Sequence, residues 1–282
     1  MSCVLRLNKY ASKLFQATCQ RGIHLSRTSE HQVMVDGLQL NYEVAGTGDK
    51  VAFCLPGALG TAKSDFGPQL SSLAGDKLTV ISWDPPGYGK SRPPPRNFCK
   101  DFLRKDAILA SQMMETLGHG KYALLGWSDG GITALMMAAM FPHQVSEMVV
   151  WGGNAFLTEE DINIYKNIRD INKWSERMRA PLEAIYGKEY FRATWEGWVD
   201  AFVKVYEEEG GDLCLSDLEK ILCPTLIVHG RKDPMVPCQH AEHLSENIKT
   251  AELVYMDDGK HNIHLRYPEE FNKLVMEFLH RK

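Results

Sequence analysis

The chain has 282 residues, 44% of them hydrophobic and 24% charged, with a formal net charge of −4. This length suits one α/β domain with an insertion, and the sequence contains no apolar run of about 18 residues or more that could span a bilayer. The slight acidity gives no basic face for a nucleic-acid backbone, so we expect the partner to be a small molecule. We also expect a monomer.

The first 29 residues differ from the rest of the chain. They contain several basic residues and frequent serine and threonine, and no acidic residue occurs before Glu30. Drawn as a helix, they place Leu5 and Phe15 on an apolar face opposite the basic side chains. This composition is typical of a mitochondrial transit peptide, with a disordered basic tail as the alternative. The missing continuous apolar stretch disfavours secretion, so we expect a mitochondrial location.

The seven cysteines are scattered through the chain. None forms a C-x-x-C pair or has the spacing of metal ligands, and their odd number argues against a complete disulfide framework. The sequence therefore predicts a reducing compartment and no metal site at the cysteines. No metal or cofactor is expected, because the serine chemistry described below requires none.

From about residue 33, strand-like and helix-like segments alternate. Residues 33–44 alternate apolar and polar side chains around Asp36-Gly37, which predicts an antiparallel hairpin. The apolar runs 51–55 and 78–83 each end in a loop rich in proline and glycine, as buried parallel strands do. Further strands are expected at 122–125, 145–151, 224–229 and 253–256, and helices at about 101–117, 132–141 and 268–280. The alternation predicts a mostly parallel central sheet flanked by helices.

Residues 154–218 have a different character. They show long amphipathic patterns, many aromatic and charged side chains, and no strand signal. This segment is predicted to be a helical cap inserted between a first core part, residues 33–153, and a second core part, residues 219–282.

The string Gly126-x-Ser128-x-Gly130 lies between a predicted strand and a predicted helix. A serine in this strand-turn-helix context is typical of a nucleophile elbow, where the sharp turn requires small neighbours. The helix that follows would direct its N–H groups toward a developing oxyanion. A plain glycine-rich turn is the alternative interpretation of such a short motif.

A serine nucleophile needs a base held by an acid, in the chain order Ser, Asp or Glu, His. Asp233 follows a predicted core strand, and His261 lies between the last strand and the last helix. We therefore predict the triad Ser128, Asp233 and His261. Asp233 could instead be a simple turn residue before Pro234, and His264 is the rival base, although its position favours packing beside the final helix.

Two backbone N–H groups are expected to form the oxyanion hole. Asp129 supplies one, and the loop after the strand 51–55 supplies the other, at Ala58 or alternatively at Leu59. In isolation this loop could equally be an ordinary strand exit. Asp84 and Arg92 are expected to brace the loops around the site.

The side chain of Asp129 raises a separate question. A carboxylate beside the nucleophile would lie in a poorly hydrated pocket, where an unpaired charge is unfavourable. Either a lysine or arginine of the protein neutralises it, or the substrate brings a positive group such as an α-amine. The residues alone leave both alternatives open.

These strings together resemble the α/β-hydrolase superfamily over nearly the whole chain from about residue 33 onward. They include the elbow, Leu55-Pro56-Gly57, the segment 83–91 and the segments around Asp233 and His261. Within it, residues 126–135, 174–177 and 259–262 resemble the biphenyl hydrolase-like proteins, also called valacyclovir hydrolases. The resemblance implies a mitochondrial serine hydrolase of α-amino acid esters, including amino acid ester prodrugs, in which Asp129 holds the substrate ammonium group.

The sequence thus predicts a serine esterase. A hydrolase of carbon–carbon bonds in aromatic ring-cleavage pathways would use the same fold and triad, but Asp129 would repel its dienoate substrate. A non-catalytic binding protein on this scaffold is the remaining alternative.

Overall fold

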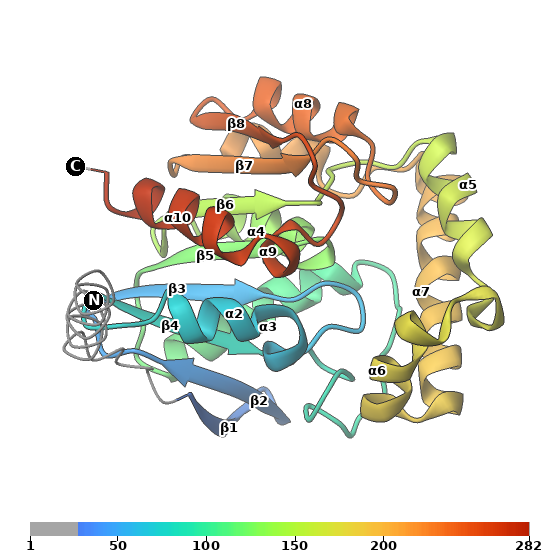
Figure 1. The fold of residues 1–282 in the computed structure, drawn as a ribbon, viewed down its shortest axis with the longest axis horizontal. Helices are drawn as coiled ribbons and strands as arrows, with labels where there is room; N and C mark the ends of the chain where they lie inside the picture. Colours follow the sequence, from blue (N-terminus) through green and yellow to red (C-terminus); the bar gives the residue numbers. More distant parts are fainter. Residues whose placement is uncertain (1–27, 282) are drawn as a thin grey trace, which may run out of the picture.

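The structure is a computed structural model that describes residues 28–281. Almost all of the predicted transit peptide, residues 1–29, lies outside this range. Within the described chain the sheet has eight strands in the order β1-β2-β4-β3-β5-β6-β7-β8 (Figure 1). They are β1 (Ser29–Val35), β2 (Leu38–Ala45), β3 (Lys50–Leu55), β4 (Leu78–Trp83), β5 (Tyr122–Trp127), β6 (Val145–Trp151), β7 (Thr225–Gly230) and β8 (Ala251–Met256).

The sheet is antiparallel at one edge and parallel elsewhere. β1 pairs with β2 with Ser29 opposite Val44, and β2 pairs antiparallel with β4. Asp36 and Gly37 at the hairpin turn have φ of 47° and 76°. Positive φ at both central positions is typical of a tight two-residue hairpin turn. The pairs β4/β3, β3/β5, β5/β6, β6/β7 and β7/β8 are parallel. Their carboxyl ends therefore lie at one edge of the sheet, where loops can bring distant residues together.

Helices cover both faces of the sheet (Figure 1). On one face α2, α9 and α10 pack over a core that includes Phe66, Trp151 and Phe271. On the other face α3, α4 and α8 pack over a larger core that continues into the cap. The bounds are α2 (Ala62–Ser72), α3 (Phe102–Thr116), α4 (Asp129–Met140), α8 (Cys238–Asn247), α9 (Ile263–Arg266) and α10 (Pro268–Leu279).

The cap is helical and stands beyond the carboxyl edge of the sheet. The arrows of β3, β6 and β7 point toward it in Figure 1. It contains α5 (Glu159–Ile168), η1 (Ile171–Lys173), α6 (Glu176–Tyr186) and α7 (Lys188–Glu209), and the short helix η2 (Leu215–Lys220) follows. A fully buried contact fastens it to the core, since Asp161 Oδ2 of α5 lies 2.9 Å from His240 Nε2 of α8. The insertion therefore covers the edge where the parallel strands end.

The sequence analysis predicted none of the helices α2, α8 and α9, of which α9 has only four residues. α2 contains Gly67 and Pro68, and Phe66 interrupts it with a non-helical φ of −121°, so its helical pattern is broken. α8 has only ten residues, too few for a clear amphipathic repeat. α4 begins at Asp129, whereas the sequence predicted a start at residue 132. The prediction was late because Gly130 and Gly131 have low helix propensity. Tertiary packing, rather than helix propensity, stabilises these segments.

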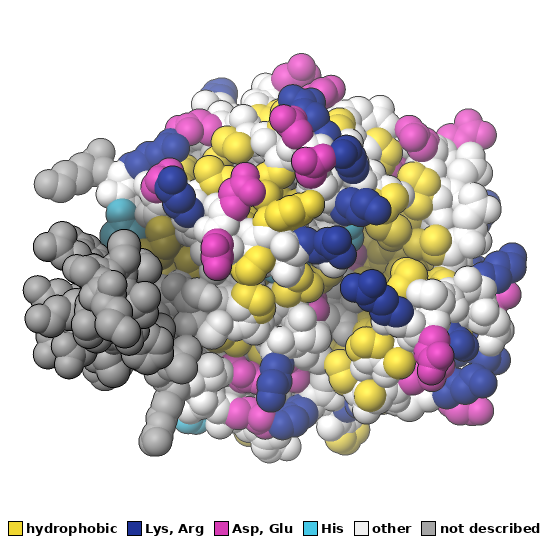
Figure 2. Space-filling model, in the orientation of Figure 1, with side chains coloured by type: hydrophobic (Ala, Val, Ile, Leu, Met, Phe, Trp, Pro, Cys, Tyr) yellow, Lys and Arg dark blue, Asp and Glu magenta, His cyan; other side chains and the backbone are white. Residues whose placement is uncertain are grey.

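The surface carries charges of both signs. On the face shown in Figure 2, Lys and Arg side chains are interspersed with Asp and Glu. Within residues 28–281 no helix is long and apolar enough to cross a membrane. The cysteines of the described chain, at positions 54, 99, 214, 223 and 238, are all free thiols.

Candidate active site

Ser128 occupies a sharp turn between β5 and α4. Its φ of 55° lies in the left-handed region, which is unfavourable for a residue other than glycine by roughly 1 kcal/mol or more. The turn is tightly enclosed: a Cβ on Gly130 would lie 1.9 Å from the Leu55 oxygen, and one on Gly126 would lie 2.5 Å from the Gly130 oxygen. The Ser128 N–H donates to the Trp151 oxygen at 3.0 Å. The surrounding backbone therefore holds the serine in its strained conformation.

The structure brings the three predicted triad residues together. His261 Nε2 lies 3.1 Å from Ser128 Oγ, and His261 Nδ1 lies 2.9 Å from Asp233 Oδ2. Asp233 is in the loop after β7, and His261 is in the loop after β8. Both distances are within hydrogen-bond range, so the imidazole connects the hydroxyl to the carboxylate.

Asp233 is ionised although it is almost fully buried. Burial by itself would raise its pKa, but the charge of His261 and the hydrogen bond to it act in the opposite direction. Asp233 Oδ1 also accepts from the N–H groups of Met235 at 2.8 Å and Val236 at 3.1 Å. These contacts together lower the pKa of Asp233 below its usual value, so the carboxylate can stabilise an imidazolium.

Two neighbours fix the position of His261. Trp127 Nε1 donates to the His261 oxygen at 2.9 Å. Gly152 has a φ of 59°, and a Cβ at this position would lie 2.9 Å from His261 Cε1. The imidazole therefore occupies space that only glycine at position 152 leaves open. The sequence analysis did not assign a role to either residue. Their role depends on contact with His261, which lies more than 100 positions away in the chain.

His264, the rival base, lies in the core. Its side chain is buried against Phe66, Trp151 and Phe271, and its Nδ1 accepts from Trp151 Nε1 at 2.9 Å. Burial lowers the pKa of His264 to about 3, so the ring is neutral. The side chain packs beside α10, as expected from the sequence.

The loop that contains Ala58 lies against the nucleophile. The Gly60 N–H donates to the Gly57 oxygen at 3.0 Å, which closes a tight turn around Ala58. A Cβ on Gly57 would lie 3.2 Å from Ser128 Cβ. Asp129 is the first residue of α4, so its N–H has no carbonyl partner within the helix. Both proposed oxyanion donors are thus carried by segments next to Ser128.

A buried acid that the sequence analysis missed supports this loop. Asp65 accepts from the Gly57 N–H at 3.0 Å and from Ser64 Oγ at 2.7 Å. Burial raises the pKa of Asp65 to about 7. The pair Thr61 and Ser64, which forms a capping box at the start of α2, was the available sequence signal for a helix here.

Asp84 and Arg92 brace the surrounding loops, as expected. Asp84 accepts from the N–H groups of Ala62 and Lys90, both at 2.8 Å. The Arg92 guanidinium lies 4.8 Å from the centroid of the Tyr186 ring and 4.7 Å from that of Tyr190. These contacts connect the loop after β4 to the core and to the cap.

The Asp129 carboxylate is buried beside the nucleophile. Its Oδ2 accepts from Trp198 Nε1 of α7 at 2.8 Å. Burial raises the pKa of Asp129 to about 6, although the Trp198 hydrogen bond and the nearby charge of Arg96 lower it in part. Within residues 28–281 no lysine or arginine forms an ion pair with Asp129, because the Arg96 guanidinium pairs with Asp106 instead. The carboxylate is hydrogen-bonded but not neutralised by an ion pair.

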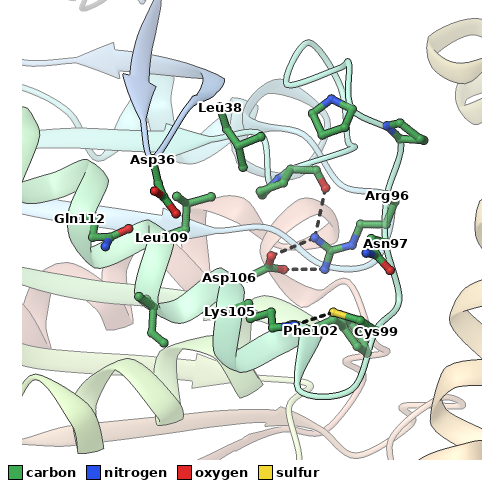
Figure 3. A pocket seen from close by; sticks show the side chains of 14 residues that line it. Asp36, Leu38, Arg96, Asn97, Cys99, Phe102, Lys105, Asp106, Leu109 and Gln112 are labelled. Atoms are coloured by element: carbon green, nitrogen blue, oxygen red, sulfur yellow. Dashed lines mark hydrogen bonds and ion pairs between the residues drawn. The ribbon is translucent and has the colours of Figure 1, made fainter.

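A separate pocket of about 470 Å³ lies beside α3 and the loop that precedes it (Figure 3). Its lining includes Arg96 and Asp106 but none of Ser128, Asp233 and His261. In the part of the chain that the structure describes, no group of three or more His, Cys, Asp or Glu side chains is arranged to hold a metal ion.

Known proteins with similar sequences agree with this architecture. A sequence model of the alpha/beta hydrolase family matches residues 52–274. "Serine hydrolase BPHL" of Homo sapiens is 47% identical over 98% of this chain and 97% of its own length, and that of Mus musculus is 50% identical over 88% and 85%. The solved meta-cleavage product hydrolase of Pseudomonas fluorescens superposes with a TM-score of 0.71 at 23% identity, covering 88% of this chain and 97% of its own.

The chain is therefore a serine hydrolase with the α/β-hydrolase fold. Within that class it belongs to the family of the biphenyl hydrolase-like serine hydrolases.

Proposed function

We propose that this hydrolase cleaves carboxylic esters of α-amino acids, including amino acid ester prodrugs, through an acyl-enzyme formed on Ser128. The observation that carries the proposal is the buried Asp129 carboxylate, which directly follows the nucleophile and has no ion-pair partner among residues 28–281. An unpaired buried carboxylate is unfavourable unless a cation joins it. The protonated α-amine of an amino acid ester is such a cation, and it lies one bond from the carbon next to the reacting carbonyl.

The geometry supports a two-stage mechanism. His261 Nε2 removes the proton of Ser128 Oγ as the oxygen attacks the ester carbonyl, and the ionised Asp233 stabilises the resulting imidazolium. The N–H groups of Ala58 and Asp129 donate to the oxyanion. His261 then gives its proton to the leaving alcohol, which leaves an acyl group on Ser128. Water, deprotonated by His261, releases the amino acid and restores the serine. These steps require no metal ion or cofactor.

Two other functions make different use of the site. A carbon–carbon bond hydrolase of the ring-cleavage type would bring the negative charge of a dienoate close to Asp129, where like charges repel. A non-catalytic binding protein would have no need for the hydrogen-bonded series Ser128–His261–Asp233. The amino acid ester alone places a positive charge where the protein leaves a negative one.

The role of the nucleophile is tested by Ser128→Ala. We expect ester turnover to fall by roughly 10⁴-fold or more, because the attacking oxygen is lost and only the oxyanion hole and substrate binding remain. Labelling of the protein by a fluorophosphonate probe should also disappear. Retained labelling would identify a different nucleophile and contradict the proposed mechanism.

The role of Asp129 is tested by Asp129→Asn with a panel of substrates that share one leaving group. The amide keeps an acceptor for Trp198 but carries no charge, so KM for an aminoacyl ester should rise roughly 10- to 100-fold, as expected for the loss of an interaction with a charged group. KM for the acyl ester without the amine should change little. Equal effects on both esters, or faster turnover of a dienoate substrate, would contradict the ammonium-binding role.

We also propose that the protein acts in mitochondria. The support is the basic, acid-free composition of residues 1–29.

A further inference from the structure

Arg96 and Asp106 form a buried ion pair close to the active site. Arg96 Nη1 lies 2.9 Å from Asp106 Oδ1 and Arg96 Nη2 lies 2.5 Å from Oδ2, the bidentate geometry of a strong pair. The exposed fractions of the two side chains are 4% and 10%. Figure 3 shows the guanidinium facing the carboxylate of α3, with a further hydrogen bond to the Pro86 oxygen at 3.1 Å.

Arg96 and Asp106 line the same small cavity as Asp129. The cavity measures about 10 Å³, near the lower limit for a single water molecule, and its lining includes Arg96, Asp106, Asp129 and Gly57. The charges of Arg96 and Asp106 both act on the pKa of Asp129, the first lowering it and the second raising it. The three ionisable groups are therefore coupled across a region with almost no water to screen them.

The hydrogen bonds determine which acid Arg96 neutralises. Both of its terminal nitrogens contact Asp106. Among residues 28–281, the Asp129 carboxylate accepts only from the neutral indole N–H of Trp198. With all three groups charged, the cluster carries one uncompensated negative charge, and that charge remains on the acid beside Ser128. Without Asp106 the charge of Arg96 would compensate Asp129.

Resting on the function proposed above, we infer that Asp106 is a specificity-determining residue. By binding Arg96 through a bidentate contact, it keeps a protein cation from neutralising Asp129 and thus reserves Asp129 for the ammonium group of the substrate. Asp106 does not touch the substrate in this role. It acts through Arg96, so its effect depends on the charge of the substrate.

The variant Asp106→Asn tests this inference. The amide keeps the shape of the side chain and one acceptor for Arg96 but removes the negative charge. We expect KM for an aminoacyl ester to rise about tenfold, the change that corresponds to about one pKa unit of altered electrostatic interaction, with less than a twofold change for the matched ester that lacks the amine. The double variant Arg96→Met/Asp106→Leu removes both charges and should return the ratio of the two KM values to within about twofold of the wild type.

A second buried carboxylate that pairs with an arginine of α3 provides the control. Asp217 Oδ2 accepts from Arg104 of α3 at 2.6 Å and is also buried, but Asp217 does not line the cavity at Asp129. Asp217→Asn should leave the ratio of the KM values unchanged. If Asp106 only stabilises the fold, Asp106→Asn will alter the KM values of both esters equally and leave their ratio unchanged. That result would overturn the inference.

A titration of Asp129 tests the electrostatic coupling independently of the proposed substrate class. The pKa of the Asp129 carboxyl can be followed by ¹³C NMR, with the resonance assigned by its loss in Asp129→Asn. In Asp106→Asn the uncompensated Arg96 should lower this pKa by about one unit whatever the substrate is. An unchanged pKa would refute the coupling even if aminoacyl esters prove to be preferred. A lowered pKa without any preference for aminoacyl esters would instead refute the proposed function and, with it, the specificity role.

Discussion

At the scale of single residues, the site contains two carboxylates whose surroundings shift their pKa values in opposite directions. Asp233 is stabilised as an anion by His261 and two backbone N–H groups, and its pKa is lowered. Asp129 is buried with one neutral donor, and its pKa is raised to about 6. Asp233 is therefore ionised at neutral pH, whereas Asp129 loses its charge as the pH falls through about 6. This difference makes the charge of the proposed ammonium site sensitive to pH.

We accordingly predict a pH-dependent preference for aminoacyl esters. An acid with a raised pKa is protonated below that pKa, so Asp129 loses its charge as the pH falls through about 6. Between pH 6.5 and pH 5 the α-amine of the substrate remains protonated, and the charged fraction of Asp129 falls about eightfold. The ratio of kcat/KM for an aminoacyl ester to that for its matched neutral ester should fall by a similar factor.

Taking this ratio cancels the pH dependence of the steps that the two substrates share. The ratio in Asp129→Asn should show no such dependence on pH. Parallel pH profiles for the two esters in the wild-type protein would contradict the prediction.

At the scale of elements, the cap contributes directly to the core site. Trp198 of α7 donates to Asp129 of α4, and the Tyr186 hydroxyl of α6 donates to the Leu59 oxygen at 2.8 Å. Leu59 itself has a φ of 55°, an unfavourable conformation that this contact helps to hold. Both contacts join a cap helix to a segment next to Ser128. The position of the cap is therefore linked to the shape and charge of the site.

We predict that Trp198→Phe weakens the ammonium site without removing the cap. Phenylalanine keeps the aromatic packing but loses the N–H that favours the charged form of Asp129. The pH at which the preference for aminoacyl esters is lost should move upward, and KM for these esters at pH 7 should rise roughly 3- to 10-fold, as expected for a lost hydrogen bond to a charged group. Substrate kinetics at several pH values measure both effects.

Trp195→Phe is the matched control. The Trp195 ring stacks on Trp198 with centroids 4.8 Å apart, but its Nε1 donates to the Ile168 oxygen at 2.9 Å, within the cap. This variant should leave the pH dependence in place. A shift of equal size in both variants would attribute the effect to aromatic packing rather than to the hydrogen bond.

At the scale of the whole molecule, the sheet positions the catalytic residues and the inserted cap covers them. The parallel strands carry Ser128, Asp233 and His261 on loops at one edge, and the insertion between β6 and β7 covers that edge with helices. β1 begins at Ser29, which pairs with Val44, so the segment proposed to direct the protein to mitochondria ends at the first residue of the first strand.

We predict that residues 1–29, fused to a fluorescent reporter, direct it into mitochondria. The physical reason is the basic, acid-free amphipathic pattern of the segment, which import into mitochondria requires. Imaging with a mitochondrial marker measures the outcome. A fusion in which Arg6, Lys9 and Lys13 are changed to glutamate is the control and should remain in the cytosol. A diffuse signal from the unaltered segment would contradict the proposed location.

The sequence by itself determined the fold class and the positions that the structure brings together at the carboxyl edge of the sheet. The signals that carried these predictions were local. Buried strands are short apolar runs, and each catalytic residue lies in the loop or turn after such a run, as Ser128 does after β5 and Asp233 after β7. Parallel strands place the ends of such runs at one edge, so the order of motifs was enough to bring the hydroxyl, imidazole and carboxylate together. The family resemblance added the suggestion that Asp129 meets a substrate cation.

Only the tertiary structure decided what surrounds these groups. The contacts of Asp129 with Trp198, of Gly57 with Asp65, and of Arg96 with Asp106 depend on packing and on the direction of individual side chains. Two of these contacts span 69 and 8 positions of the chain, and no residue period or motif encodes either of them. The sequence alone left open whether a protein cation neutralises Asp129. The structure shows Arg96 paired with Asp106, because burial and bidentate geometry favour that contact.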